Sequence, residues 1–116
     1  MSKYKIFHNP RCSKSRQTLQ ILKEHDCEVE VILYLETAID ESVLVDILRK
    51  MSLSPRDLLR KGEQEFKDNN LKNSNYSDQE IIKFMIQHPK LIERPIVLKG
   101  DKAILGRPPE NVLELI

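Results

Sequence analysis

The apolar residues in the first third of the chain change from strand-like to helical spacing and back again. Residues 4–8 read Tyr-Lys-Ile-Phe-His and predict a short strand, whereas an apolar stripe that ends at Leu22 predicts a helix over residues 13–25. Residues 29–34 are rich in β-branched side chains and predict a second strand. If the helix is a right-handed crossover, the two strands are parallel, so the chain opens with a β-α-β unit.

The middle of the chain has helical spacing. After Asp40, apolar residues recur at intervals of three and four, at Leu44, Ile47, Leu48 and Met51. Ser54 and Pro55 then supply an N-cap and a proline at the first helical position, so we expect two helices to meet near Ser52.

A further helix is predicted beyond a polar stretch at residues 61–76, to which no element can be assigned. Residues 77–80 read Ser-Asp-Gln-Glu, a capping-box sequence that opens a helix. Pro89 ends that helix, because the residue before a proline is disfavoured in the helical conformation.

The last third of the chain predicts a hairpin and a closing helix. Residues 96–98 and 103–105 are apolar and flank Gly-Asp at residues 100–101, which indicates a tight β-turn. Residues 109–115 predict a final helix. A β-α-β unit followed at a distance by a β-hairpin and a helix is typical of a thioredoxin-like fold. We therefore predict one α/β domain over residues 1–116, with a helical insertion between its two halves.

Composition narrows the class of protein. Hydrophobic residues make up 40% of the chain and charged residues 32%, which is typical of an ordinary folded protein. Lys and Arg number 19 against 18 for Asp and Glu, so a broad nucleic-acid-binding surface is not expected. No stretch has the apolar length of a signal peptide or a membrane span, which favours a cytoplasmic protein without a membrane partner.

The two cysteines have different surroundings. Cys12 and Cys27 form neither a C-x-x-C pair nor a metal-binding cluster, so we expect a free thiol and no metal. Cys27 lies between Asp26 and Glu28, whose negative charge disfavours a thiolate, and is interpreted as structural or incidental. A whole helix separates the two cysteines, so a second thiol would have to come from another molecule.

Cys12 lies where the first strand turns into the first helix, within the sequence His-Asn-Pro-Arg-Cys-Ser-Lys-Ser-Arg at residues 8–16. A helix N-terminus presents unpaired N–H groups and the positive end of the helix dipole, which together bind anions and stabilise a thiolate. Nearby basic residues, including a protonated His8, add positive charge. The alternative is that Cys12 is a small core residue and His8 merely ends a strand.

Arginines recur beside prolines later in the chain, at Arg94-Pro95 and Arg107-Pro108, and Arg60 follows a pair of leucines. Guanidinium groups suit tetrahedral oxyanions because their donors match two oxygens at once. Each arginine alone reads as a solvated surface charge, and the periodicity does not show whether they converge on Cys12.

Several separate blocks of sequence carry a family resemblance. In chain order they are His-Asn-Pro-Arg-Cys at 8–12 with Ser15 and Arg16, Tyr-Leu-Glu-Thr at 34–37, Leu-Leu-Arg-Lys at 58–61, Gln-His-Pro at 87–89, Glu-Arg-Pro-Ile-Val at 93–97 and Gly-Arg-Pro at 106–108. Together they closely resemble the glutaredoxin-coupled arsenate reductase (ArsC) family. The resemblance runs from about residue 3 to residue 115.

The resemblance implies roles for individual residues. Cys12 would attack arsenate as the nucleophile, and His8 would help to lower its pKa. The oxyanion and the arsenic intermediates would be held by Arg60, Arg94 and Arg107. Pro95 looks like the family's cis-proline at the edge of the site, and Ser15 and Arg16 complete the motif around Cys12 and are expected to support it.

The resemblance also implies the reaction and its partners. Water leaves as a Cys12–arsenic(V) ester forms, glutathione adds as co-substrate, and glutaredoxin carries off the oxidised thiol as arsenite is produced. No bound cofactor is implied. The substrate is arsenate or another small oxyanion.

The sequence departs from the best-known arsenate-reducing members at two places. Ser13 and Lys14 stand where those members have Gly-Thr, and the chain ends soon after its last helix. Both features resemble the short chromosomal members of the family, for which arsenate turnover does not follow from the resemblance. The role of Lys14 stays open.

Two other functions are compatible with the same residues. One is a glutathione- or glutaredoxin-linked thiol oxidoreductase with a substrate other than arsenate. The other is a transcriptional regulator of the Spx type, which resembles the family in fold and binds RNA polymerase. Members that sense oxidation through a C-x-x-C switch need a cysteine where this chain has Ser15.

Overall fold

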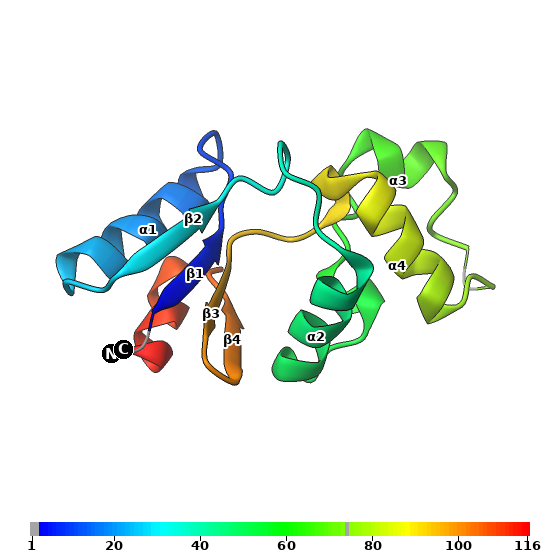
Figure 1. Cartoon of the computed structure of the whole chain (residues 1–116). Helices are drawn as coiled ribbons and strands as arrows, with labels where there is room; N and C mark the ends of the chain where they lie inside the picture. Colours follow the sequence, from blue (N-terminus) through cyan, green and yellow to red (C-terminus); the bar gives the residue numbers. More distant parts are fainter. Residues whose placement is uncertain (1–2, 74) are drawn as a thin grey trace. The chain divides into compact units, whose positions relative to one another are not determined.

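The structure is a computed structural model that describes residues 3–73 and 75–116. It divides into two compact units (Figure 1). The first, which we call the sheet unit, spans Met1–Thr37 and Arg94–Ile116, and the second, the helical unit, spans Ala38–Glu93. The single domain predicted over residues 1–116 stays a prediction.

The sheet unit contains a mixed four-stranded sheet. Its strands are β1 (Tyr4–Phe7), β2 (Val29–Ile32), β3 (Ile96–Lys99) and β4 (Lys102–Leu105), in the spatial order β2-β1-β3-β4. β1 is parallel to β2 and antiparallel to β3, which pairs antiparallel with β4. The parallel pair needs a crossover, and helix α1 (Ser13–Glu24) supplies it, as the sequence predicts.

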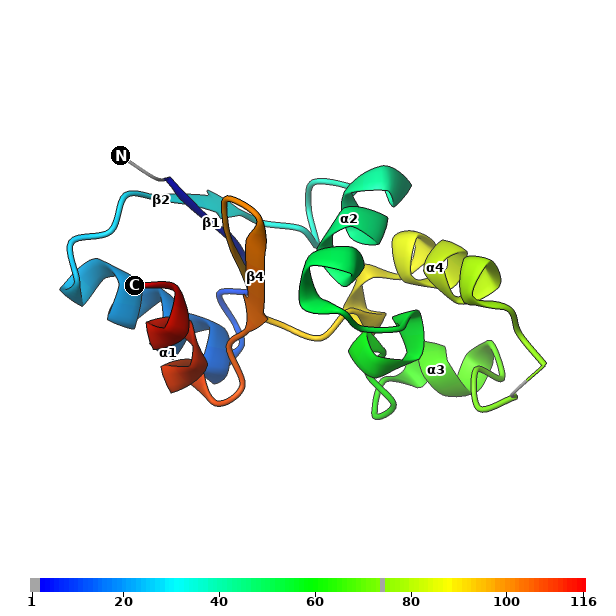
Figure 2. The same cartoon turned by 90° about the horizontal axis from the view of Figure 1, so that it is seen from below.

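α1 and the 3₁₀ helix η3 (Pro109–Leu115) lie side by side on one face of this sheet (Figures 1 and 2). Side chains from both helices and from alternate positions of the central strands form the core between them: Tyr4, Ile6, Leu22, Val97, Val112 and Leu115. The Tyr4 hydroxyl also donates a hydrogen bond to the Leu115 carbonyl at 3.0 Å. The predicted closing helix is therefore present, in the tighter 3₁₀ form.

The predicted hairpin is confirmed. β3 and β4 are joined by Gly100 and Asp101, and Gly100 adopts a φ of +59°, a conformation that glycine reaches without steric cost. The strands extend to Lys99 and from Lys102, one residue closer to the turn on each side than expected.

The helical unit contains three α-helices and two short 3₁₀ helices in its described residues. They are α2 (Glu41–Met51), η1 (Pro55–Leu58), α3 (Gln64–Asp68), α4 (Asp78–Gln87) and η2 (Pro89–Leu91). The buried apolar faces of α2 and α4 and the leucines of η1 and η2 supply its core.

Local signals fix the ends of these helices. Ser52 takes a left-handed conformation and ends α2, so the expected break there is confirmed. Ser77 and Glu80 form the predicted capping box: the Glu80 N–H donates to the Ser77 hydroxyl at 3.2 Å, and the Ser77 N–H donates to the Glu80 carboxylate at 3.0 Å.

The polar stretch 61–76 contains the short helix α3, which the periodicity does not reveal. Arg56 holds the chain beyond α3, since its guanidinium donates to the carbonyl oxygens of Leu71 at 2.9 Å and Asn73 at 2.6 Å. Ser74, in the same stretch, lies outside the described residues.

The predicted fold class is confirmed. A β-α-β unit and a later β-hairpin share one sheet, and the helical segment lies between them along the chain. None of the helices in the described part of the chain is long and apolar enough to cross a membrane.

Candidate active site

Cys12 is the N-cap residue of α1. Its backbone is extended (φ −93°, ψ 122°), and its carbonyl accepts the first helical hydrogen bond, from the N–H of Arg16 at 3.0 Å. The loop before it is closed by Asn9, whose carbonyl accepts from the Cys12 N–H at 3.0 Å and whose side chain accepts from the Arg11 N–H at 3.0 Å. The thiol therefore lies at the first turn of the helix, where backbone N–H groups lack helical partners.

The pKa of the Cys12 thiol lies below its ordinary value of 9.0. Burial alone raises this pKa, because it disfavours the charged form. The backbone amides of Ser15 and Lys14 and the side chain of Arg94 lower it by hydrogen bonding to the sulfur, and the Arg94 charge adds to their effect. The lowering effects prevail, so the Cys12 thiol loses its proton more readily than an ordinary cysteine, in the direction that its position at the helix N-terminus predicts.

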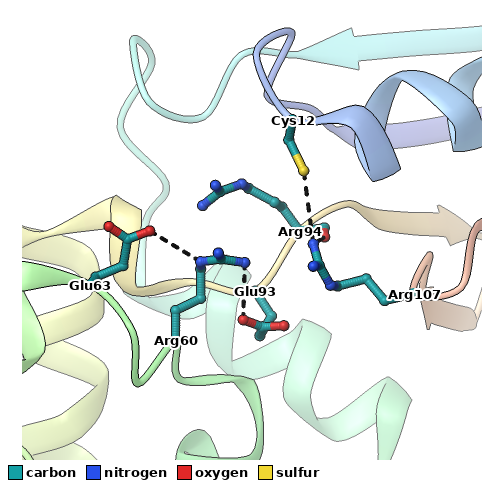
Figure 3. Close-up of polar contacts among 6 residues, drawn as sticks. All are labelled: Cys12, Arg60, Glu63, Glu93, Arg94 and Arg107. Carbon is teal, nitrogen blue, oxygen red and sulfur yellow. Dashed lines mark hydrogen bonds and ion pairs between the residues drawn. The ribbon is translucent and has the colours of Figure 1, made fainter.

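Arg107 also approaches the sulfur. Its Nη1 atom lies 3.8 Å from Cys12 Sγ and donates a hydrogen bond to the Arg94 carbonyl at 3.0 Å (Figure 3). The guanidinium groups of Arg94 and Arg107 are thus brought to one thiol, although Arg107 lies 95 residues from Cys12 in the sequence. The peptide bonds Arg94-Pro95 and Arg107-Pro108 are both cis, and the first is the one that the resemblance implies.

Gly106 allows the segment that carries Arg107 to pack closely against α1. A Cβ atom at this position would lie 2.5 Å from Thr18 Oγ1 and 2.8 Å from Pro95 Cγ, both closer than real contacts allow. The Gly106 N–H donates to the Pro95 carbonyl at 2.9 Å, and the buried Thr18 hydroxyl lies 3.3 Å from the Gly106 carbonyl. Only glycine fits between these neighbours without moving them.

Ser15 and His8 form a buried pair beneath the loop. The Ser15 hydroxyl lies 2.6 Å from His8 Nδ1 and accepts a hydrogen bond from the Asn9 N–H at 3.1 Å. Ser15 is fully buried, and His8 and Asn9 are exposed by 6% and 7%. Since buried polar groups need partners, this network holds the loop before Cys12 in one conformation.

The expectation that a protonated His8 adds charge beside Cys12 needs correction. Burial is the largest cause of a lowered pKa at His8, and the charges of Lys23 and Arg16 lower it further. Its ordinary pKa is 6.5, so a lowered value leaves the imidazole neutral at neutral pH. His8 therefore shapes the loop through Ser15 and supplies no positive charge there.

The other residues around the motif have structural contacts. The Arg16 guanidinium donates to the Pro10 carbonyl at 2.9 Å, which braces the loop ahead of Cys12. Cys27 is a free thiol that packs against the core of the sheet unit, in agreement with its structural interpretation.

Arg60 belongs to the helical unit, where two carboxylates hold it. Its Nε lies 3.2 Å from Glu63 Oε1, and its Nη1 lies 3.2 Å from Glu93 Oε1 (Figure 3). Neither glutamate stands out in the sequence as a partner of Arg60. The spacing of Arg60 and Glu63, three residues apart, is a usable signal for the first pair. The second pair spans 33 residues and leaves no local signal.

Groups of three or more His, Cys, Asp or Glu side chains that could hold a metal ion do not occur in residues 3–73 and 75–116. The chemistry that the described groups offer is that of an activated thiolate with guanidinium groups beside it. Such an arrangement suits nucleophilic attack on an anion, because the guanidinium groups offset the charge that otherwise repels the thiolate.

Comparison with known proteins identifies the family to which the chain belongs. The sequence profile of the ArsC family matches residues 7–115. The chain is 51% identical to the uncharacterized protein YfgD of Escherichia coli K12, over 97% of this chain and 95% of that protein. It is 45% identical to an arsenate reductase of Neisseria meningitidis serogroup A, over 97% of each chain.

Solved structures agree with these sequence matches. An arsenate reductase from Vibrio cholerae superposes with a TM-score of 0.96 at 42% sequence identity, covering 99% of this chain and 98% of the other. The predicted resemblance and the thioredoxin-like fold are thus confirmed, because they rest on matches that span nearly the whole chain. The chain belongs to the ArsC family.

Proposed function

We propose that this protein reduces arsenate to arsenite, with Cys12 as the nucleophile and with glutathione and glutaredoxin as the reductants. The observation that carries the proposal is the lowered pKa of the Cys12 thiol at the N-terminus of α1, with Arg94 and Arg107 beside the sulfur. The names of the Neisseria and Vibrio relatives support arsenate as the substrate.

The reaction begins as the Cys12 thiolate attacks arsenic and a water molecule leaves, which forms a Cys12–arsenic(V) ester. Glutathione then adds with loss of a second water. Reduction of arsenic(V) to arsenic(III) needs two electrons, which two thiols supply when they become a disulfide. Glutaredoxin provides the second thiol by attacking the glutathione sulfur, and hydrolysis of the Cys12–arsenic(III) bond releases arsenite.

The positions of the cysteines support an external reductant. Cys12 precedes α1 and Cys27 follows it, and a helix of that length extends roughly 18 Å at 1.5 Å per residue. Two cysteines this far apart do not form a disulfide without movement of the backbone. A reducing compartment such as the cytoplasm would keep both thiols free and would supply glutathione.

In the resemblance that the sequence carries, Arg60, Arg94 and Arg107 hold the oxyanion. Arg94 and Arg107 fit this role through their contacts with Cys12, because an oxyanion bound to the sulfur would meet the same guanidinium groups. Lys14 contributes its backbone amide to the thiolate, and its side chain is exposed.

The decisive experiment measures arsenite formation by the purified protein with arsenate, glutathione and glutaredoxin. We expect turnover that is lost in Cys12→Ser and retained in the matched control Cys27→Ser. Absence of turnover by a protein whose Cys12 still reacts rapidly with iodoacetamide would reject arsenate as the substrate and favour a thiol oxidoreductase acting on another compound.

A further inference from the structure

Thr18 is a fully buried polar residue on α1, one helical turn beyond Lys14. Its hydroxyl donates a hydrogen bond to the Lys14 carbonyl at 2.8 Å and lies 3.3 Å from the carbonyl oxygen of Gly106, which is also buried. A hydroxyl has a single proton, so the two carbonyl oxygens share it. Thr18 therefore links the first turn of α1 to a segment that lies 88 residues away along the chain.

Both ends of this link lie beside the reactive thiol. The backbone amide of Lys14 hydrogen-bonds to the Cys12 sulfur. Gly106 precedes Arg107, whose Nη1 atom lies 3.8 Å from the same sulfur (Figure 3). Lys14 and Gly106 are thus each connected directly to a group that stabilises the thiolate. A side chain that contacts both of them fixes the separation between the helix turn and the segment that carries the arginine.

Close packing at Gly106 makes this separation well defined. A Cβ atom at Gly106 would lie 2.5 Å from Thr18 Oγ1 and 3.0 Å from Thr18 Cγ2, so the backbone there rests directly on the threonine. The Gly106 N–H donates to the Pro95 carbonyl at 2.9 Å, and Pro95 follows Arg94, the other arginine beside the thiol. The segments that carry the two arginines are therefore joined to each other at Gly106 and to α1 at Thr18.

The hydroxyl of Thr18, and not only the size of its side chain, is needed for this packing. Valine has nearly the same shape but would leave the buried Gly106 carbonyl without this donor, which costs free energy. Its methyl group would also need about 3.3 Å or more from each carbonyl oxygen. The Lys14 carbonyl lies only 2.8 Å from Thr18 Oγ1. Replacing the hydroxyl by a methyl group should therefore move α1 and the arginine segment apart.

We propose that Thr18 is a positioning residue, whose hydroxyl holds α1 and the segment that carries Arg107 at the separation that brings the guanidinium to Cys12. It acts through the Lys14 amide and the Arg107 guanidinium and takes no part in making or breaking bonds. The inference rests on the proposed function where it concerns the oxyanion, because arsenate on the sulfur would meet Arg107 only at this separation. The reactivity of the thiol itself depends on Thr18 whichever anion is the substrate.

The test is the pH dependence of Cys12 alkylation by iodoacetamide, measured in a Cys27→Ser background so that one thiol remains. In Thr18→Val we expect the midpoint of the pH profile to move to higher pH, with a roughly threefold smaller acid dissociation constant of the thiol, because Arg107 draws away from the sulfur. Thr18→Ser keeps the hydroxyl and should keep the wild-type midpoint. In an Arg107→Ala background, Thr18→Val should move the midpoint less, since the two residues act through one contact.

Tyr4→Phe is the matched control, because it removes another buried hydroxyl hydrogen bond of the sheet unit. It should lower the melting temperature without moving the midpoint. A wild-type midpoint in Thr18→Val, or an equal movement in Thr18→Ser or Tyr4→Phe, would overturn the proposal and leave Thr18 a purely structural residue. If Thr18→Val does not fold, Thr18→Ala removes the same hydroxyl without setting a methyl group against the carbonyl oxygens, and the same movement is required of it.

A second measurement separates this proposal from the proposed function. Without glutathione, arsenate should protect Cys12 of the wild-type protein from iodoacetamide, and roughly threefold more arsenate should be needed for half-protection in Thr18→Val. If arsenate does not protect the wild-type protein, arsenate is rejected as the substrate, and the pH midpoints still decide the role of Thr18.

Discussion

The two charged clusters of this protein have inverse composition. In the sheet unit, one thiol is approached by two guanidinium groups, those of Arg94 and Arg107. In the helical unit, one guanidinium is held by two carboxylates, those of Glu63 and Glu93. Counting only these groups, and taking Cys12 as the thiolate, the first cluster has a net charge of +1 and the second a net charge of −1.

The difference shows two ways of fixing an arginine side chain. Arg107 is oriented by the carbonyl oxygen of Arg94, which accepts a hydrogen bond and contributes no full negative charge. Arg60 is oriented by carboxylates, which fix the guanidinium and also offset its charge. Arg107 thus brings positive charge beside the Cys12 thiol, whereas the charge of Arg60 is offset by the carboxylates that hold it.

The largest expected effect on the reactivity of Cys12 comes from removing one of the two arginines beside it. Arg94→Ala removes a hydrogen bond and a charge that lower the pKa of Cys12, so the alkylation rate of Cys12 at neutral pH should fall roughly tenfold. Arg107→Ala should have a smaller effect, because its nitrogen lies 3.8 Å from the sulfur. Arg49→Ala, at an exposed pair in the helical unit, is the control. Equal rates in all three variants would show that the backbone amides alone maintain the thiolate.

An intermediate effect is expected from moving Arg107 without removing it. In Gly106→Ala, the added methyl group collides with Thr18 and Pro95, so the segment must shift and Arg107 moves relative to Cys12. We expect the alkylation rate to fall roughly threefold and the effect to vanish in an Arg107→Ala background, since coupled residues are not additive. If Gly106→Ala lowers the alkylation rate equally in the wild-type and the Arg107→Ala backgrounds, Gly106 does not act through Arg107 and the substitution disturbs the protein more generally.

The smallest expected effect concerns His8 and tests whether its imidazole is charged in the folded protein. The pKa of His8 is lowered by folding, so the unfolded chain takes up a proton more readily once the pH falls through 6.5. The free energy of unfolding should therefore decrease as the pH falls from 6.5 to the lower pKa that His8 has in the folded protein. His8→Asn keeps a polar partner for Ser15 and does not titrate. It should shift the melting temperature by only a few degrees at pH 7 and should remove this acid-side loss. If the wild-type protein instead gains stability relative to His8→Asn as the pH falls, His8 is protonated in the native state and the correction made above is wrong.

The sequence predicted most of the elements because their signals are local. Capping residues, prolines and the 3.6-residue period lie within a few positions of the helices that they define, as the Ser77–Glu80 box shows. Helix α3 was missed because five residues are too few for a period to emerge. Cys12 was found for the same reason as the helices: its position at the start of α1 follows from the pattern of its neighbours.

The sequence by itself therefore determined the fold class, the position of Cys12 at the start of α1 and, through several matching blocks, the family. Only the tertiary structure decided the charges around each group. It brought Arg107 to a cysteine 95 residues away, paired Arg60 with Glu93 across 33 residues, and buried His8 so that it is neutral. The physical reason is that helix propensity and capping act over a few residues along the chain, whereas electrostatic partners and desolvation depend on distances in space, which folding alone sets.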